Sequence, residues 1–318
     1  MTKKRDLRIV FMGTPEFAVT ILDTLIEQEY NIVGVITAPD KPAGRGRKLN
    51  KSAIKEYAET KGLTILQPTN LKSEAFLEEL KSLNANLQII VAFRMLPKVV
   101  WQMPDHGTFN LHASLLPNYR GAAPINWAII NGETKTGVST FFIDEKIDTG
   151  EMIFQDEIAI EPNETAGSLH DKLMYLGSNL VLKTVKAIAR DTVQTTPQPE
   201  DAISRTAFKL NKDNCKIDWT ASINIIYNKI RGLSPYPAAW CQLINGEDLL
   251  DVKIYTAEKE IIDHNFNSGT IISTKKEVKV AVKEGYINIL DIKLPGKRTM
   301  DIKSLLNGYT FKTEAKML

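Results

Sequence analysis

The sequence predicts an α/β protein in two parts: a parallel sheet covered by helices on both faces, followed by a small β-barrel. One observation predicts the sheet. Short apolar runs alternate with amphipathic stretches through the first 190 residues, and apolar strands separated by helices are typical of doubly wound parallel sheets. A second observation predicts the barrel, because short β-rich runs separated by turn residues follow beyond residue 207. A chain of 318 residues is long enough for both parts.

The first strand is expected at Leu7–Met12. Thr14 follows this strand and is expected to be the N-cap of a helix, because its hydroxyl can accept a backbone hydrogen bond. Pro15 suits the first helical position, so the helix is expected from Pro15 to about Glu29. The next apolar runs predict strands at 31–37, 63–66 and 87–92 and one that ends at His112. The amphipathic stretches between them predict helices at 52–61, 73–83 and 97–103.

The second part of the alternation leads to a domain boundary. A helix is expected from Pro124 to Asn131, strands at 137–143 and 152–160, and a long helix at 165–190. The polar stretch 192–201 contains two prolines and reads as a connection. We therefore expect a domain at 1–190, a linker at 191–206 and a domain at 207–318. The last domain begins with a helix near 220–231 and continues with strands at 252–255, 270–272, 278–282 and 287–292.

Composition excludes several classes of protein. No run approaches the roughly 18 apolar residues of a membrane span. The first residues, Met-Thr-Lys-Lys-Arg-Asp, precede only a short apolar run, so no signal peptide is expected. Cys215 and Cys241 lie far apart without CxxC spacing, and the four histidines are scattered. These features predict a cytoplasmic protein without a structural metal.

Polar side chains gather at the end of the predicted strand near residue 112. Asn110 and His112 are two residues apart, so they point to the same face of that strand. The carboxyl ends of strands are where α/β sheets usually place their ligands. Asp148 follows in Ile-Asp-Thr-Gly, a polar turn between two apolar runs. An amide, an imidazole and a carboxylate together can polarise a carbonyl, move a proton and orient the base.

A dinucleotide-binding oxidoreductase is the first alternative for such a sheet. The turn after the first strand reads Gly-Thr-Pro-Glu-Phe-Ala, with one glycine where the dinucleotide fingerprint needs three. Asp40 has the residue type of the ribose-binding acid, but a long loop beginning with Lys41-Pro42 follows it. The sequence therefore disfavours a nicotinamide cofactor.

The loop from Lys41 to Lys51 carries five basic residues, two glycines and no acid. By composition alone it is a solvated surface loop. Beside the catalytic end of a sheet, however, basic side chains on a glycine-rich backbone favour contact with phosphates of a nucleic acid.

Several of these segments resemble one family. They are the Phe-Met-Gly-Thr-Pro-Glu-Phe-Ala run at 11–18, the Pro-Ala-Gly-Arg-Gly-Arg loop, Asn-Leu-His-Ala-Ser-Leu-Leu-Pro, Tyr-Arg-Gly-Ala-Ala-Pro-Ile and Ile-Asp-Thr-Gly. The chain is similar in these motifs to methionyl-tRNA formyltransferases, within the formyltetrahydrofolate-dependent formyltransferases. The resemblance also includes Gly-Leu-Ser-Pro-Tyr-Pro-Ala-Ala-Trp at 232–240 and Leu-Asn-Gly at 306–308. It implies a Rossmann-like formyltransferase domain followed by an OB-like, tRNA-contacting domain.

The resemblance implies formyl transfer from 10-formyltetrahydrofolate to the amino group of methionyl initiator tRNA, supporting the start of protein synthesis. Asn110 would stabilise the carbonyl oxygen as it gains charge. His112 would either donate to that oxygen or relay the proton lost by the amine, and Asp148 would orient His112 or accept the proton through water. No metal is implied, and a monomer without membrane contact is expected.

The remaining site residues are also implied by the resemblance. Ser114, Leu115, Leu116 and Pro117 correspond to the folate-binding loop. Arg45, Arg47 and Lys48 are expected to reach the tRNA, Arg45 at its acceptor end. One segment departs from the family: Ala92-Phe-Arg-Met-Leu-Pro97 is one residue shorter than usual and brings Arg94 to the wall of the expected folate pocket.

Two further alternatives stay open at this point. One is a formyltransferase that acts on a nucleotide-linked amino sugar, which shares the Asn, His and Asp set. The basic loop and the second domain favour the tRNA enzyme over it. The other is an RNA-binding protein without catalytic activity, which the intact Asn110, His112 and Asp148 set disfavours.

Overall fold

The protein is described by a computed structural model, which describes residues 5–43, 48–199 and 205–318. By their contacts, the residues form two compact units. The first comprises the described residues within 1–121, 137–158 and 170–206, and the second comprises those within 122–136, 159–169 and 207–318. Each unit thus gathers segments that are separated in the sequence.

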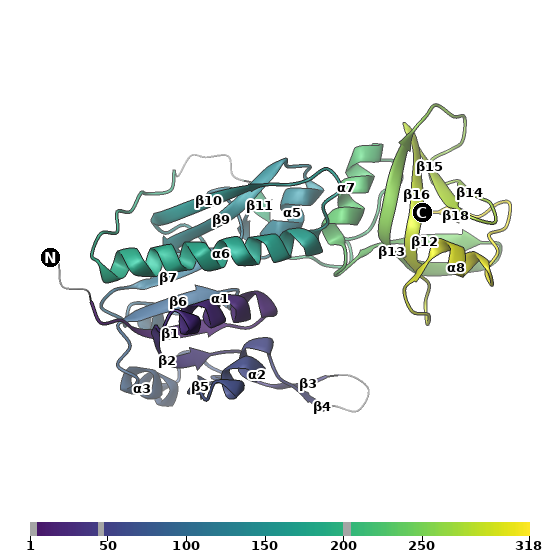
Figure 1. The fold of residues 1–318 in the computed structure, drawn as a ribbon. Coiled ribbons are helices and arrows are strands. Elements are labelled where there is room, and N and C mark those ends of the chain that lie inside the picture. Colours follow the sequence, from purple (N-terminus) through teal and green to yellow (C-terminus); the bar gives the residue numbers. More distant parts are fainter. Residues whose placement is uncertain (1–4, 44–47, 200–204) are drawn as a thin grey trace. The chain divides into compact units, whose positions relative to one another are not determined.

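A seven-stranded sheet, in the order β10-β9-β7-β6-β1-β2-β5, organises the N-terminal part of the chain (Figure 1). Its strands are β1 (Arg8–Gly13), β2 (Asn31–Ile36), β5 (Ile65–Leu66), β6 (Leu87–Val91), β7 (Thr108–His112), β9 (Lys135–Phe142) and β10 (Met152–Ala159). The pairs β1–β2, β1–β6, β2–β5 and β6–β7 are parallel, whereas β7 and β9 are antiparallel. The doubly wound α/β class expected from the alternating pattern is confirmed.

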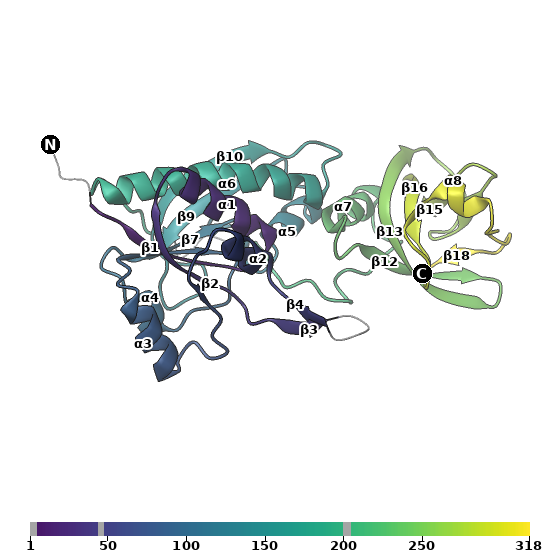
Figure 2. The same ribbon diagram turned by 60° about the horizontal axis from the view of Figure 1, so that its bottom comes forward.

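Helices cover both faces of this sheet (Figure 2). On one face, α3 (Glu74–Ser82) and α4 (Lys98–Trp101) pack against alternate residues of β1 in one apolar cluster that includes Val10, Met12 and Phe76. On the other face, α6 (Ala166–Ala189) approaches β7 closely. A Cβ atom on Gly177 would lie 2.8 Å from Leu111 Cδ2, so glycine is what permits this spacing.

Two further helices complete this layer. The helix α1 (Glu16–Glu27) lies beside α6, where the rings of Phe17 and His170 are 5.3 Å apart. The expected cap of α1 is wrong by one residue: Pro15, not Thr14, occupies the N-cap position, and the carbonyl of Pro15 accepts the first bond, from the Ala18 N–H. The helix α2 (Ala53–Thr60) begins at a true cap, because the Ser52 side chain accepts from the Lys55 N–H.

The C-terminal part of the chain is a nearly closed antiparallel barrel. The strands β12 (Ala239–Asn245), β13 (Asp248–Ile261), β14 (Ile271–Ser273), β15 (Val278–Val282), β16 (Gly285–Lys293) and β18 (Lys316–Met317) follow the order β14-β15-β16-β13-β12-β18. A short strand β17 (Met300–Asp301) pairs with β16. A single bridge between Thr270 and Lys316 links the two ends of this order, so the barrel is nearly closed. The predicted OB-like barrel is confirmed, although β12 and most of the length of β13 were not expected.

Helices close the second unit. The core of the barrel includes Ile226 and Ile230 of α7 (Ile223–Leu233). The other face of α7 meets α5 (Pro124–Ile130), and the Asn126 side chain donates to the Gly232 carbonyl at 2.8 Å. A short helix α8 (Ile302–Leu306) follows β17. Among the described residues, no helix combines the length and the apolar character that crossing a bilayer requires.

Candidate active site

The strand β7 places Asn110 and His112 on one face of the sheet. Asn110 lies opposite Ile90 of β6 and Phe141 of β9, so it is held from both sides by strand pairing. His112 is only 6% exposed. Asn110 is partly exposed, and its side chain makes no hydrogen bond within the described part of the chain. An amide in this state has both its donor and its acceptor available to a ligand.

The ring of His112 is anchored on one side. Its Nε2 lies 2.7 Å from the carbonyl oxygen of Tyr119. A carbonyl only accepts, so Nε2 carries a proton and donates it there. The opposite nitrogen, Nδ1, lies 3.8 Å from Asp148 Oδ2, which is longer than a hydrogen bond. In the neutral imidazole Nδ1 is therefore the unprotonated nitrogen, and a proton taken up there would face the carboxylate.

Asp148 is held in the turn between β9 and β10. Its φ angle is +55°, a left-handed conformation that aspartate tolerates better than most residues. Its Oδ2 accepts a hydrogen bond at 3.0 Å from the Gly121 N–H. The structure thus brings Asp148 and His112 together from segments 36 positions apart (148 − 112), as the sequence predicts.

Gln198 contacts the Asp148 turn, which the sequence did not indicate. Its Nε2 donates to the carbonyl oxygens of Asp148, at 3.0 Å, and of Gly150, at 2.8 Å. Its Oε1 accepts from the Arg120 guanidinium, at 2.6 Å from Nη2. The residue is 8% exposed, and its side chain links the Asp148 turn to the segment after β7. Gln198 lies between two prolines in the expected linker, and no sequence pattern there predicts a contact with the Asp148 turn.

The loop Ser114–Pro117 is held in place by hydrogen bonds from the side chains of Ser139 and Gln155. The Ser139 hydroxyl lies 3.1 Å from the Leu116 nitrogen, whose N–H it accepts, and 2.6 Å from the Ser114 carbonyl oxygen. Gln155 Nε2 donates to the Leu116 carbonyl at 2.9 Å. Ser114 and Leu116 are buried, while Leu115 and Pro117 are partly exposed. These contacts fix the loop, so its exposed groups form a preorganised surface.

The expected tRNA contacts lie at the limit of the described residues. Arg45 and Arg47 are outside them, and for Lys48 only the backbone is described. The flanking strands β3 (Lys41–Ala43) and β4 (Lys48–Asn50) pair in an antiparallel register, with Lys41 opposite Asn50. The described ends of the basic loop therefore form the stem of a hairpin.

Arg94, in the segment that departs from the family, is tied to a neighbouring loop. Its guanidinium donates to the carbonyl oxygens of Pro68 and Thr69. Ala92 at the start of this segment has a φ angle of +49°. Within the described ranges, no three His, Cys, Asp or Glu side chains converge as a metal-binding group.

Comparison with protein families gives two matches. The family described as formyl transferase matches residues 7–185. The family described as formyl transferase, C-terminal domain, matches residues 209–310. Together they cover most of both parts of the chain.

Curated relatives cover the chain almost completely. A protein of Flavobacterium johnsoniae named methionyl-tRNA formyltransferase is 65% identical over 311 residues, which is 98% of this chain and 99% of the relative. One of the same name from Flavobacterium psychrophilum is 62% identical, over 96% of this chain and 98% of the relative. Among solved structures, WlaRD, a sugar 3N-formyl transferase crystallised with dTDP and 5-N-formyl-THF, aligns with a TM-score of 0.65. It covers 92% of this chain and 100% of that one at 22% identity, which shows a shared fold.

Proposed function

The chain belongs to the formyl transferase family, and we propose that it transfers the formyl group of 10-formyltetrahydrofolate to the amino group of methionyl initiator tRNA. The observation that carries this substrate is 65% identity, over nearly the full length of both chains, to a protein named methionyl-tRNA formyltransferase. The product would start protein synthesis. We propose accordingly that the protein acts as a monomer in the cytoplasm, with residues 207–318 contacting the tRNA.

Asn110 stabilises the charge that develops during transfer. The α-amine of methionine attacks the formyl carbon, a new N–C bond forms, and the carbonyl oxygen gains negative charge. A fixed amide N–H aimed at that oxygen stabilises the transition state more than the ground state. The Asn110 side chain supports this role, because it is partly exposed and has no hydrogen-bond partner among the described residues.

His112 moves the proton that the amine loses. Its Nε2–H already donates to the Tyr119 carbonyl, so the nitrogen available for a proton is Nδ1. There the Asp148 carboxylate, 3.8 Å away, compensates the charge of the imidazolium. This geometry favours a proton relay over donation to the formyl oxygen. The reaction is completed when the bond from the formyl carbon to N10 of the folate breaks and N10 takes up the proton.

The donor binds on the Ser114–Pro117 loop in this proposal. Leu115 offers apolar contact to the pterin, and the hydrogen bonds from Ser139 and Gln155 keep the loop in one conformation. Arg45, Arg47 and Lys48 contact phosphates of the tRNA, with Arg45 at the acceptor end. Asn110, His112 and Asp148 are the catalytic residues.

A substrate panel tests the function. The protein is incubated with a labelled formyl donor and, separately, with methionyl initiator tRNA, uncharged initiator tRNA and a nucleotide-linked amino sugar. We expect label on the charged tRNA alone. Label on the sugar alone would replace the proposal with the amino-sugar activity, and binding of tRNA without any transfer would favour an RNA-binding protein.

A further inference from the structure

We propose that Asp40, Lys55 and Gln67 are positioning residues for the hairpin stem formed by β3 (Lys41–Ala43) and β4 (Lys48–Asn50), and that they hold this stem in place for binding of the tRNA. This inference rests on the proposed function, because it assigns the hairpin a tRNA-binding role. None of the three residues is expected to touch the reacting atoms.

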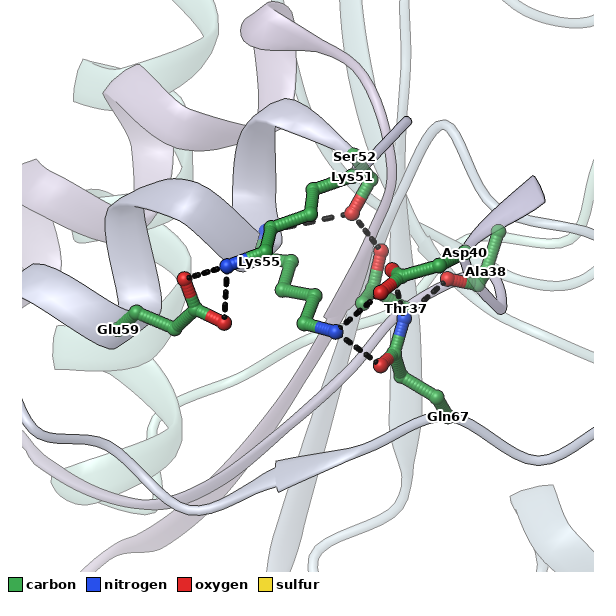
Figure 3. A network of polar contacts seen from close by, with 8 residues as sticks. All are labelled: Thr37, Ala38, Asp40, Lys51, Ser52, Lys55, Glu59 and Gln67. Atoms are coloured by element: carbon green, nitrogen blue, oxygen red, sulfur yellow. Dashed lines mark hydrogen bonds and ion pairs between the residues drawn. The ribbon is translucent and has the colours of Figure 1, made fainter. Parts of the chain in front are cut away.

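The three side chains form a closed set of contacts (Figure 3). Asp40 immediately precedes β3, Lys55 lies in the first turn of α2, and Gln67 follows β5. Lys55 Nζ donates to Asp40 Oδ2 at 2.6 Å and to Gln67 Oε1 at 2.7 Å. Gln67 Nε2 donates to Asp40 Oδ1 at 2.8 Å and to the Ala38 carbonyl at 2.8 Å. Both carboxylate oxygens of Asp40 are therefore satisfied.

A second contact ties the same two ends of the hairpin. The hydroxyl oxygens of Thr37 and Ser52 lie 2.7 Å apart, joining the end of β2 to the start of α2. Thr37 is fully buried. Ser52 also caps α2 by accepting from the Lys55 N–H at 3.2 Å. The chain that enters the hairpin is thus bound twice to the chain that leaves it.

The ion pair in this set differs from an ordinary surface pair. The side chains of Lys55 and Asp40 are only 15% and 20% exposed, whereas those of the neighbouring Lys51–Glu59 pair are 42% and 41% exposed. The hydrogen bond from Lys55, followed by that from Gln67, holds the pKa of the Asp40 carboxyl below its usual value. An ion pair that is shielded and shares its hydrogen bonds with a third side chain holds its geometry better than an exposed one.

The same contacts also neutralise the negative charge of Asp40 at the base of the hairpin. A free carboxylate at the base of a phosphate-binding hairpin would repel a polyanion. Lys55 neutralises Asp40, and both partners are then occupied with each other rather than with a ligand. Asp40, which has the residue type of a ribose-binding acid, is for that reason not available to a nucleotide. The paired Asp40 and Lys55 are therefore better suited to supporting the hairpin than to binding a ligand.

The test separates tRNA use from chemistry. Initial rates of the full-length protein are measured against methionyl-tRNA and against the formyl donor for the wild type, Asp40→Asn and Lys55→Met. We expect kcat/KM for tRNA to fall about ten- to a hundredfold in each variant, because a small misplacement of a positioning element has effects of this size. The KM for the donor and kcat at saturating tRNA should stay within about twofold of wild type, since the catalytic residues are unchanged.

Controls make the result specific. Glu145→Gln removes the acid of the exposed Lys98–Glu145 pair in the same unit and should leave tRNA kinetics unchanged. The double variant Asp40→Asn/Lys55→Met should lose no more than either single variant, because residues that act as one unit are not additive. Circular dichroism checks that each variant is folded. If Lys55→Met does not fold, Asp40→Asn still tests the inference, because it keeps the shape of the side chain.

Three outcomes overturn the inference. Wild-type kinetics with tRNA in Asp40→Asn would show that the contacts do not position the hairpin. A lower kcat together with a higher KM for both substrates would show that the three residues have only a general structural role. If the wild-type protein itself transfers no formyl group to methionyl-tRNA, the proposed function fails, and the inference falls with it.

Discussion

At the scale of single residues, the site depends on which atoms are already engaged. His112 uses Nε2 for the Tyr119 carbonyl and turns Nδ1 toward Asp148. Asn110 remains available on the same strand face. A binding site works by leaving selected polar groups unpaired while the surrounding groups are satisfied. In the proposed mechanism, the role of each side chain therefore depends on its hydrogen-bond partners as much as on its residue type.

Replacement of His112 tests its role as the proton relay. His112→Ala should lower kcat by about 10²-fold or more, a usual magnitude for a lost acid or base, while tRNA affinity stays close to that of wild type. Single-turnover rates and filter binding measure the two quantities. The matched control is His170→Ala, at a histidine on α6 whose side chain is 35% exposed. It should change neither kcat nor tRNA affinity. Weak tRNA binding with normal turnover at saturation would contradict the assignment.

Replacement of Gln198 tests whether the Asp148 turn must be held in place. Gln198→Met keeps the length of the side chain but removes its donor and acceptor, so the carbonyls of Asp148 and Gly150 lose their partner. We expect the free energy of unfolding to fall by about 1–3 kcal/mol and kcat to fall while the KM for tRNA is retained. Gln242→Met, at a glutamine with one weak contact on the barrel, should change neither quantity. A Gln198→Met variant with normal kcat would show that the turn holds Asp148 without it.

At the scale of elements, close approaches between backbones decide how the helices pack. The chain is glycine where a helix meets a strand, at Gly177, and where α7 meets α5, at Gly232. The pattern of apolar residues predicts that these helices exist and which face they bury. It does not predict the partner of each face, because any apolar stripe can pack against another.

Gly232→Ala tests the contact between α5 and α7. The new Cβ would lie 2.7 Å from Ile130 Cγ1, 3.0 Å from the Ile130 nitrogen and 3.1 Å from the Asn126 carbonyl oxygen. Two of these atoms belong to the backbone and cannot move aside easily, so we expect a loss of about 1–3 kcal/mol in the free energy of unfolding. Urea denaturation measures it. Gly308→Ala, where no atom lies within 4 Å of the added Cβ, is the control, and equal stability of the two variants would refute the close contact.

At the scale of the whole molecule, each unit contains an apolar cluster of buried residues. One cluster of buried residues fills the barrel, and it contains Cys215 and Cys241. Burial raises the pKa of the Cys215 thiol and raises that of Cys241 to about 12. Only the thiolate reacts with alkylating reagents, so both thiols are protected while the barrel is folded.

Thiol labelling follows the opening of the barrel. At about pH 8.5, where an ordinary thiol is half ionised, the native protein should react with iodoacetamide far more slowly than free cysteine does. In denaturant both thiols should react, because the unfolded chain exposes them and returns their pKa values toward the ordinary one. Mass spectrometry counts the modified thiols. Fast labelling of Cys241 in native buffer would show that the barrel core is open.

The sequence by itself determined the fold class, the strand that carries Asn110 and His112, and the place of Asp148 in the turn between the next two strands. These depend on local periodicity and on residue types within short motifs, which can be read along the chain. Only the tertiary structure decided that Tyr119 anchors His112, that Gln198 holds the Asp148 turn, and that Asp40, Lys55 and Gln67 form one set of contacts. The physical reason is that these partners are 7 to 50 positions apart, without a fixed spacing. Two of the contacts also use backbone carbonyls, which every residue carries and no sequence pattern marks.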